Sequence, residues 1–253
     1  MKTDTNKKIF EFIKEKGQIS PKEIISFIGF SAQAVFRQLK KLQERSLVQK
    51  SGSPPQVFYH LPMTEKERLI QQVVKWVCDK ETDIINNQDF YCSARDIFQF
   101  RNERALKTLL DKGVGESLSY LLIALSGEIG NNSFDHNLGN WPNIPGVYFK
   151  VEMAERLFML ADRGQGVWAT LKKVRASIKN DEEALQTAFT DTVYSRAPER
   201  RGNGLKFVKK VIQENNLRLK FYSGQGWCEI KNKEIMFGTA EKNIPGVMAI
   251  IEF

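Results

Sequence analysis

Glu128, Asn132 and His136 stand four positions apart in the sequence. On a helix this spacing places the three side chains on one face, one turn after another. A carboxylate, an amide and an imidazole in a row suit a site that binds a metal ion and phosphate. The same stretch has two Gly and two adjacent Asn, and each costs a helix about 0.5–1 kcal/mol relative to Ala. We therefore predict a functional helix; the alternative is a polar helix face whose Asn side chains only cap or bond the backbone.

A glycine motif follows at Asp162, Gly164 and Gly166, directly after the apolar run at 157–161. The apolar run predicts a buried strand. A carboxylate at the end of a strand, followed by alternating Gly, indicates a turn that faces a ligand, because Gly lets the backbone approach closely.

A second glycine motif consists of Arg201, Gly202, Gly204 and Leu205 and precedes a predicted helix at 206–215. The free N–H groups at the start of a helix can receive phosphate. Either glycine motif alone would more often be an ordinary turn. Their order and spacing after Glu128 indicate that both bind a ligand.

The order of the three motifs resembles that of the GHKL ATPases, whose nucleotide-binding domain has the Bergerat fold. This superfamily includes gyrase, the heat-shock chaperones, histidine kinases, MutL and the anti-sigma-factor kinases. Its N-box, Glu-x-x-x-Asn with His or Lys four residues later, is similar to Glu128, Asn132 and His136. Its Asp-x-Gly-x-Gly and Gly-x-Gly-Leu motifs are similar to residues 162–166 and 202–205.

The resemblance covers roughly residues 105–253 and implies an α/β sandwich with helices on one face of a mixed sheet. It implies ATP and Mg²⁺ as ligands. Asn132 would bind the metal ion, Glu128 would be the catalytic general base, and Asp162 would accept a hydrogen bond from the adenine amine. The other nucleotide contacts would come from His136, Gly164, Gly166, Arg201, Gly202, Gly204 and Leu205.

A long charged stretch, residues 167–201, separates the two glycine motifs. By resemblance it is the ATP lid, which we expect to become ordered only when phosphates are present. Arg196, Arg200 and Arg201 are its candidates for phosphate contact.

Residues 1–62 predict a separate unit of three helices and a β-hairpin. The helices are expected at 7–16, 21–28 and 32–45, and the hairpin at 47–60. Ser20 and Ser31 are predicted N-caps, and Pro21 occupies a favoured first helical position. This unit resembles a winged helix-turn-helix, and the Ser-x-x-x-Val-x-Arg-x-Leu-x-x-Leu spacing of its third helix resembles a recognition helix.

Positive charge gathers in this unit: residues 1–60 have eleven Lys or Arg against five Asp or Glu, a net charge of +6, and the whole chain has +8. Such an excess is typical of nucleic-acid binding. The polar side of the third helix, which enters the major groove in this motif, has Gln33, Arg37, Lys40 and Lys41. We predict that these four residues bind double-stranded DNA; the alternative is a protein-binding winged helix with a solvated basic face. Phe36 is expected to pack against the first helix rather than to contact a thymine methyl.

Residues 63–104 are expected to form a helical connector. Thr64 and Glu67 predict a capping box for a helix that runs to about Lys80. Apolar residues lie around much of this helix, so we expect it to contact two neighbours, as an interdomain helix or in a homodimer.

The sequence argues against several other classes of protein. No apolar run approaches the roughly 18 residues of a transmembrane helix, and the N-terminus lacks the apolar segment of a signal peptide. Three scattered Cys without a Cys-x-x-Cys argue against zinc and disulfides and suit a reducing cytoplasm. The helical segment before the GHKL motifs has no His, so a histidine autokinase is not expected. The chain ends with the predicted sheet, so the transducer domain that follows this sheet in gyrase and MutL is not expected either.

Together these features predict an α+β protein that binds ATP and DNA, in which Mg-ATP modulates the binding of DNA or of a protein partner. Weak ATP hydrolysis is expected. The alternative function is a Ser/Thr protein kinase of the anti-sigma-factor type, with the winged helix as a protein-interaction module. A third is a nucleotide sensor without turnover.

Overall fold

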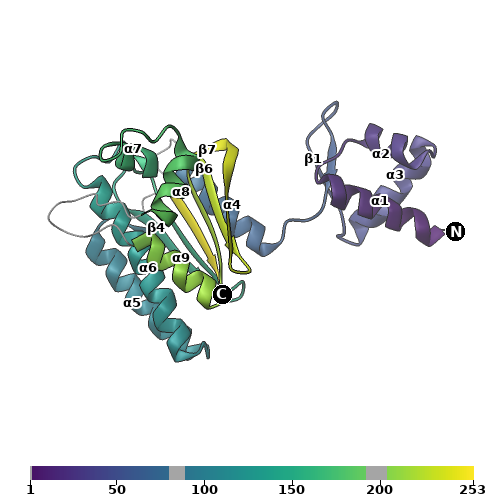
Figure 1. The fold of residues 1–253 in the computed structure, drawn as a ribbon. Helices are drawn as coiled ribbons and strands as arrows, with labels where there is room; N and C mark the ends of the chain where they lie inside the picture. The colour runs from purple at the N-terminus through teal and green to yellow at the C-terminus, as the bar shows by residue number, and fades with distance from the viewer. Residues whose placement is uncertain (1, 80–88, 192–203) are drawn as a thin grey trace. The chain divides into compact units, whose positions relative to one another are not determined.

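The computed structural model describes residues 2–79, 89–191 and 204–253 (Figure 1). Its internal contacts divide the chain into two compact units, Met1–Arg68 and Leu69–Phe253. The sequence predicted three parts, with a connector at 63–104. In the structure, most of that connector belongs to the second unit.

The N-terminal unit consists of three helices and a two-stranded hairpin. These are α1 (Lys2–Lys16), α2 (Pro21–Ile28), α3 (Ala32–Glu44), β1 (Gln49–Ser51) and β2 (Phe58–His60). Its core is made of fully buried aliphatic side chains from all three helices, among them Ile9, Ile13, Ile24, Val35 and Leu39. The chain between α1 and α2 also joins the hairpin, because Ile19 and Tyr59 exchange two backbone hydrogen bonds.

Local capping explains where the helices of this unit begin and end. Ser20 forms a capping box with Glu23, and the hydroxyl of Ser31 accepts the N–H of Ala34. Gly29 ends α2 in the left-handed region, with φ of 72°. Both predicted N-caps are confirmed.

The second unit contains a five-stranded sheet in the order β3-β4-β5-β7-β6. The strands are β3 (Tyr91–Cys92), β4 (Val147–Glu152), β5 (Leu157–Asp162), β6 (Arg218–Lys231) and β7 (Glu234–Glu252). All neighbouring strands are antiparallel, so the prediction of a mixed sheet was wrong. Two of the four pairs, β4–β5 and β6–β7, are joined by tight turns with residues at positive φ (Arg156; Asn232 and Lys233), and strands joined in this way must be antiparallel.

Helices cover both faces of this sheet, not one face as predicted. They are α4 (Glu65–Cys78), α5 (Arg95–Asp111), α6 (Glu116–Asn137), α7 (Gly166–Lys172), α8 (Asp181–Thr190) and α9 (Gly204–Glu214). Phe158 and Leu160 of β5 point into a core with α5, α6, α8 and α9. The alternate residues Leu157, Met159 and Ala161 pack with α4 on the opposite face.

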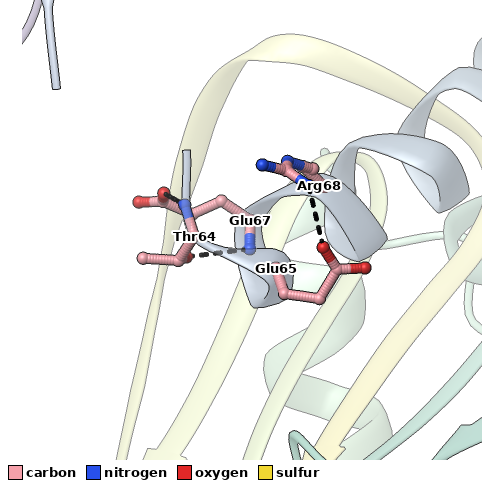
Figure 2. Close-up of polar contacts among 4 residues, drawn as sticks. All are labelled: Thr64, Glu65, Glu67 and Arg68. Atoms are coloured by element: carbon pink, nitrogen blue, oxygen red, sulfur yellow. Dashed lines mark hydrogen bonds and ion pairs between the residues drawn. The ribbon is translucent and has the colours of Figure 1, made fainter. Parts of the chain in front are cut away.

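The first turn of α4 has the predicted capping box (Figure 2). The N–H of Thr64 donates to the Glu67 carboxylate at 2.8 Å, and the N–H of Glu67 donates to the Thr64 hydroxyl at 3.2 Å. The helix ends at Cys78, two residues earlier than predicted. Its side chains Leu69, Val73, Trp76 and Val77 are buried on the sheet, so most of its apolar surface is used inside the second unit.

The glycine-rich interior of α6 has a packing reason that the sequence did not reveal. A Cβ at Gly130 would lie 2.1 Å from the ring of Phe98 on α5, so only Gly permits the two helices to approach this closely. Gly130 is therefore explained by helix packing and does not by itself indicate a binding site. Although α6 is 22 residues long, none of the described helices combines the length and hydrophobicity of a membrane span.

Part of the predicted ATP lid belongs to the core. Ala184, Leu185 and Phe189 of α8 are fully buried, and the carboxylate of Asp181 accepts the N–H of Gln225 on β6 at 3.0 Å. The expectation that 167–201 is ordered only by phosphate was therefore wrong for α8, because its apolar face has a place in the core. Arg196, Arg200 and Arg201 lie outside the described residues.

Candidate functional site

A cleft of about 560 Å³ opens in the second unit, lined by residues from α5 to α9, by the end of β5 and by one residue each of β6 and β7. Its size suits a small-molecule ligand. Seven of the predicted site residues line it: Glu128, Asn132, His136, Asp162, Gly166, Gly204 and Leu205. Gly164 lies beside the cleft without lining it. Arg201 and Gly202 are outside the part of the chain that the structure describes.

The first and third motifs meet where α9 begins. A Cβ on Gly204 would lie 2.5 Å from the Glu128 carboxylate and 3.3 Å from the Asn132 amide nitrogen. Glycine at this position leaves room for both groups, and a residue with a side chain would require the Glu128 carboxylate to shift. The N-terminus of α9 therefore lies close to a carboxylate and an amide.

Asp162 ends β5 and is only 1% exposed. One carboxylate oxygen accepts the Ser133 hydroxyl at 2.6 Å, and the other accepts the N–H of Gly164 at 2.7 Å. Burial raises the pKa of Asp162 to about 6, because it disfavours the charged form more than these hydrogen bonds favour it. Asp162 is therefore a buried carboxyl that titrates close to neutral pH.

The turn after Asp162 is fixed by a residue that sequence reasoning missed. The Asn137 side chain accepts the N–H of Gln165 at 2.9 Å and donates to the Ser133 carbonyl at 2.8 Å. A Cβ on Gly164 would lie 2.0 Å from the same amide. The missing side chain of Gly164 therefore leaves the space that the Asn137 amide occupies. Asn137 is at the last position of α6, and an Asn there predicts a helix end rather than a role in a site.

Ser223 of β6 is a second residue that was missed. Its buried hydroxyl accepts the N–H of Val167 at 2.9 Å and donates to the carbonyl of Gly246 at 2.8 Å. A Cβ on Gly166, whose φ is 79°, would lie 2.9 Å from this hydroxyl. No sequence signal was available, because Ser223 is far from the motifs along the chain and is a common residue in strands and turns.

Polar groups on α6 complete the wall of the cleft. His136 lines it, and its backbone carbonyl accepts the side-chain amide of Gln165. Asp135 forms an ion pair with Arg95 of α5. Asn131 also lines the cleft, and its side-chain oxygen is buried without a hydrogen-bond partner among the described residues. An unsatisfied buried oxygen of this kind is costly unless a bound group donates to it.

In the N-terminal unit, α3 separates an apolar side from a polar side. Val35, Leu39 and Leu42 are buried, whereas the four predicted DNA-binding residues are exposed: Gln33, Arg37, Lys40 and Lys41. Phe36, which was expected to pack on α1, keeps 45% of its surface exposed.

Comparison with known families agrees with this geometry. A family model described as winged helix-turn-helix DNA-binding matches residues 2–49. The N-terminal unit is a winged helix-turn-helix DNA-binding domain. No curated protein matches the chain. For the second unit, the GHKL resemblance rests on the three motifs alone.

Proposed function

We propose that this protein is a DNA-binding regulator that binds ATP with Mg²⁺ in the cleft of its second unit, and that nucleotide binding modulates its affinity for DNA or a protein partner. The observation that carries the proposal is the close approach of Gly204 to Glu128 and Asn132, in the same cleft that Asp162 lines. Described residues of all three motifs thus line one cavity, which supports the proposal.

Asp162 fits the adenine end of the nucleotide. Above a pH of about 6 its carboxylate is ionised and can accept a hydrogen bond from the adenine amine. Guanine has a carbonyl oxygen at that ring position, which a carboxylate would repel. Ser133 and Gly164 hold the two carboxylate oxygens in place, so the group is positioned before the nucleotide binds. This arrangement favours ATP over GTP.

The charge of the cleft fits a nucleotide that binds together with a divalent cation. The described charged lining consists of four carboxylates, Glu128, Asp135, Asp162 and Asp191, with Arg95 as the basic group. A bare triphosphate would be repelled there. Bound Mg²⁺ would supply positive charge and polarise the phosphate oxygens.

Two side chains are suited to the metal and phosphate end. Asn132 can offer an amide oxygen to the metal without adding negative charge. Glu128, one turn earlier on α6, is exposed in the cleft and could take a proton from a water or hydroxyl nucleophile. The N-terminal N–H groups of α9, close to both, can donate to phosphate.

Calorimetric titration of the full chain with ATP, with and without Mg²⁺, tests the proposal. Asn132→Ala should lose the Mg²⁺-dependent part of the affinity. Asn243→Ala, which alters an exposed Asn outside the cleft and outside the pocket beside it, should bind as the wild type does. Equal affinity of Asn132→Ala and wild type in Mg²⁺ would remove Asn132 from the site.

The fate of the γ-phosphate separates the possible activities. With labelled ATP, Glu128→Gln should keep nucleotide binding and lose turnover. Label transferred to a protein would indicate a kinase, and binding without release of label would indicate a sensor.

A further inference from the structure

An aromatic side chain lies among the polar residues of α3. Phe36 is 45% exposed, whereas Val35 immediately before it and Leu39 three residues later are fully buried. Gln33 and Lys40 lie one turn before and one turn after Phe36, so they flank it on the same side of the helix. The core of the domain is therefore filled by its aliphatic neighbours, and much of the Phe36 ring remains available for contact.

Other exposed aromatic residues of this unit differ in position. Phe27 is 56% exposed, but its ring stacks on Phe12 at 3.7 Å and it belongs to α2. Phe30 is 54% exposed and lies in the turn before α3, not on the helix itself. Phe36 is on α3, beside the basic residues that would hold the helix against DNA phosphates. The charge around Phe36 therefore favours DNA over an apolar protein surface as the partner that covers it.

The major groove of DNA presents one apolar group, the 5-methyl group of thymine. Cytosine has a hydrogen at the equivalent position, so a side chain that contacts the methyl distinguishes the two pyrimidines. Aromatic and aliphatic side chains are the residues that make this contact. An exposed Phe on a groove-facing helix has the chemistry for it.

We propose that Phe36 contacts the 5-methyl group of a thymine in the DNA bound by α3, and that this contact makes thymine preferred at one position of the binding site. The inference rests on the DNA-binding role proposed for α3 and adds to it a residue that determines sequence specificity. Arg37, Lys40 and Lys41 would supply affinity through phosphates, which carries no sequence information by itself.

The test uses the full chain and duplexes selected from a random DNA library. In the selected site each thymine is replaced in turn by uracil, which removes the methyl group and changes nothing else. Burial of one such carbon is worth about fourfold in affinity, so uracil at one position should weaken wild-type binding by about fourfold. Phe36→Ala should bind the two duplexes equally. Phe100→Ala, at an exposed Phe in the second unit, should keep the fourfold difference.

A second measurement separates base contact from loss of the fold. Phe36→Ala should keep the wild-type dependence of affinity on salt, whereas Arg37→Ala should reduce the slope of log K against log[salt] by about one if Arg37 contacts phosphate. A reduced slope for Phe36→Ala would mean that α3 itself is disturbed and would overturn the inference.

Two further results would overturn it. One is a wild-type protein that binds thymine and uracil duplexes equally at every position; the other is a fourfold difference that survives in Phe36→Ala. Either leaves DNA binding intact. If the chain selected no duplex from the library at any salt concentration, the DNA-binding function would fail together with the inference.

Discussion

Asp162 shows how the tertiary environment changes the chemistry of a single residue. The residue is 1% exposed, and its pKa is raised to about 6 by burial. Because the folded-state pKa lies above that of the unfolded chain, the folded protein binds the proton more tightly. The stabilising effect of protonation is fully present below the unfolded pKa and is lost as pH rises through about 6.

This pKa predicts a measurable dependence of stability on pH. As pH rises from about 4 to 7, wild type should lose about 2–3 kcal/mol of unfolding free energy relative to Asp162→Asn, which does not titrate. Urea unfolding of both proteins across this range measures the difference. A constant difference would show that the carboxyl titrates at an ordinary pKa. The control is Asp181→Asn, which replaces a partly exposed carboxylate on α8 of the same unit.

At the scale of elements, Arg163, the residue after Asp162, links α4 to the end of β5 through contacts with Trp76. Arg163 is 2% exposed, donates from Nε to the carbonyl of Trp76 at 2.8 Å, and lies 5.2 Å from the centre of the Trp76 ring. That carbonyl is in the last turn of α4, where helical partners are lacking and a positive charge is favourable. Burial lowers the pKa of Arg163.

We predict that Arg163→Met destabilises the second unit. The Trp76 carbonyl would remain buried without its donor, which costs about 1–3 kcal/mol. Arg163→Lys should recover only part of the loss, because one ammonium cannot reproduce the planar guanidinium contact. Urea unfolding and amide exchange at 69–78 measure the effect.

The matched control is Arg175→Met, which removes an arginine whose ion pair with Asp191 is about half exposed (side-chain exposures of 47% and 45%). Its cost should stay below about 1 kcal/mol. If Arg163→Met were as stable as the wild type, the contact with Trp76 would contribute little to the free energy of unfolding.

For the whole molecule, the proposed regulation needs a connection between the two units along the chain. Only four residues separate the end of β2 at His60 from the start of α4 at Glu65. The helix α4 in turn packs on β5, the strand that ends at Asp162, and Arg163 beside it donates to the Trp76 carbonyl of α4. A change at the cleft therefore has a packed route to the helix that follows the DNA-binding domain, and this route does not need the predicted lid.

Mg-ATP is accordingly predicted to change DNA affinity by about 5–150-fold, the range typical of coupling energies of 1–3 kcal/mol. By linkage, DNA should change ATP affinity by the same factor. Anisotropy titrations without nucleotide, with ADP and with a non-hydrolysable ATP analogue measure it, and Asn132→Ala should remove the effect. Superimposable curves for wild type in all three conditions would mean that the units act independently.

The sequence by itself determined the features that depend on residues a few positions apart. The caps at Ser20, Ser31 and Thr64 follow from side chains that bond the backbone three residues later, so the starts of three helices could be predicted. The four-residue spacing of Glu128 and Asn132 likewise required one helix face. These interactions are local, and little in the tertiary structure can override them.

Only the tertiary structure decided which distant residues meet and how deeply they are buried. It showed that Gly130 leaves room for the ring of Phe98, whereas Gly204 leaves room for the Glu128 carboxylate and the Asn132 amide. The sequence gives no sign of this difference between the two glycines. The tertiary structure also raised the pKa of Asp162 and placed α8 in the core. The physical reason is that steric overlap and desolvation depend on atoms brought together from distant parts of the chain, which neither periodicity nor spacing records.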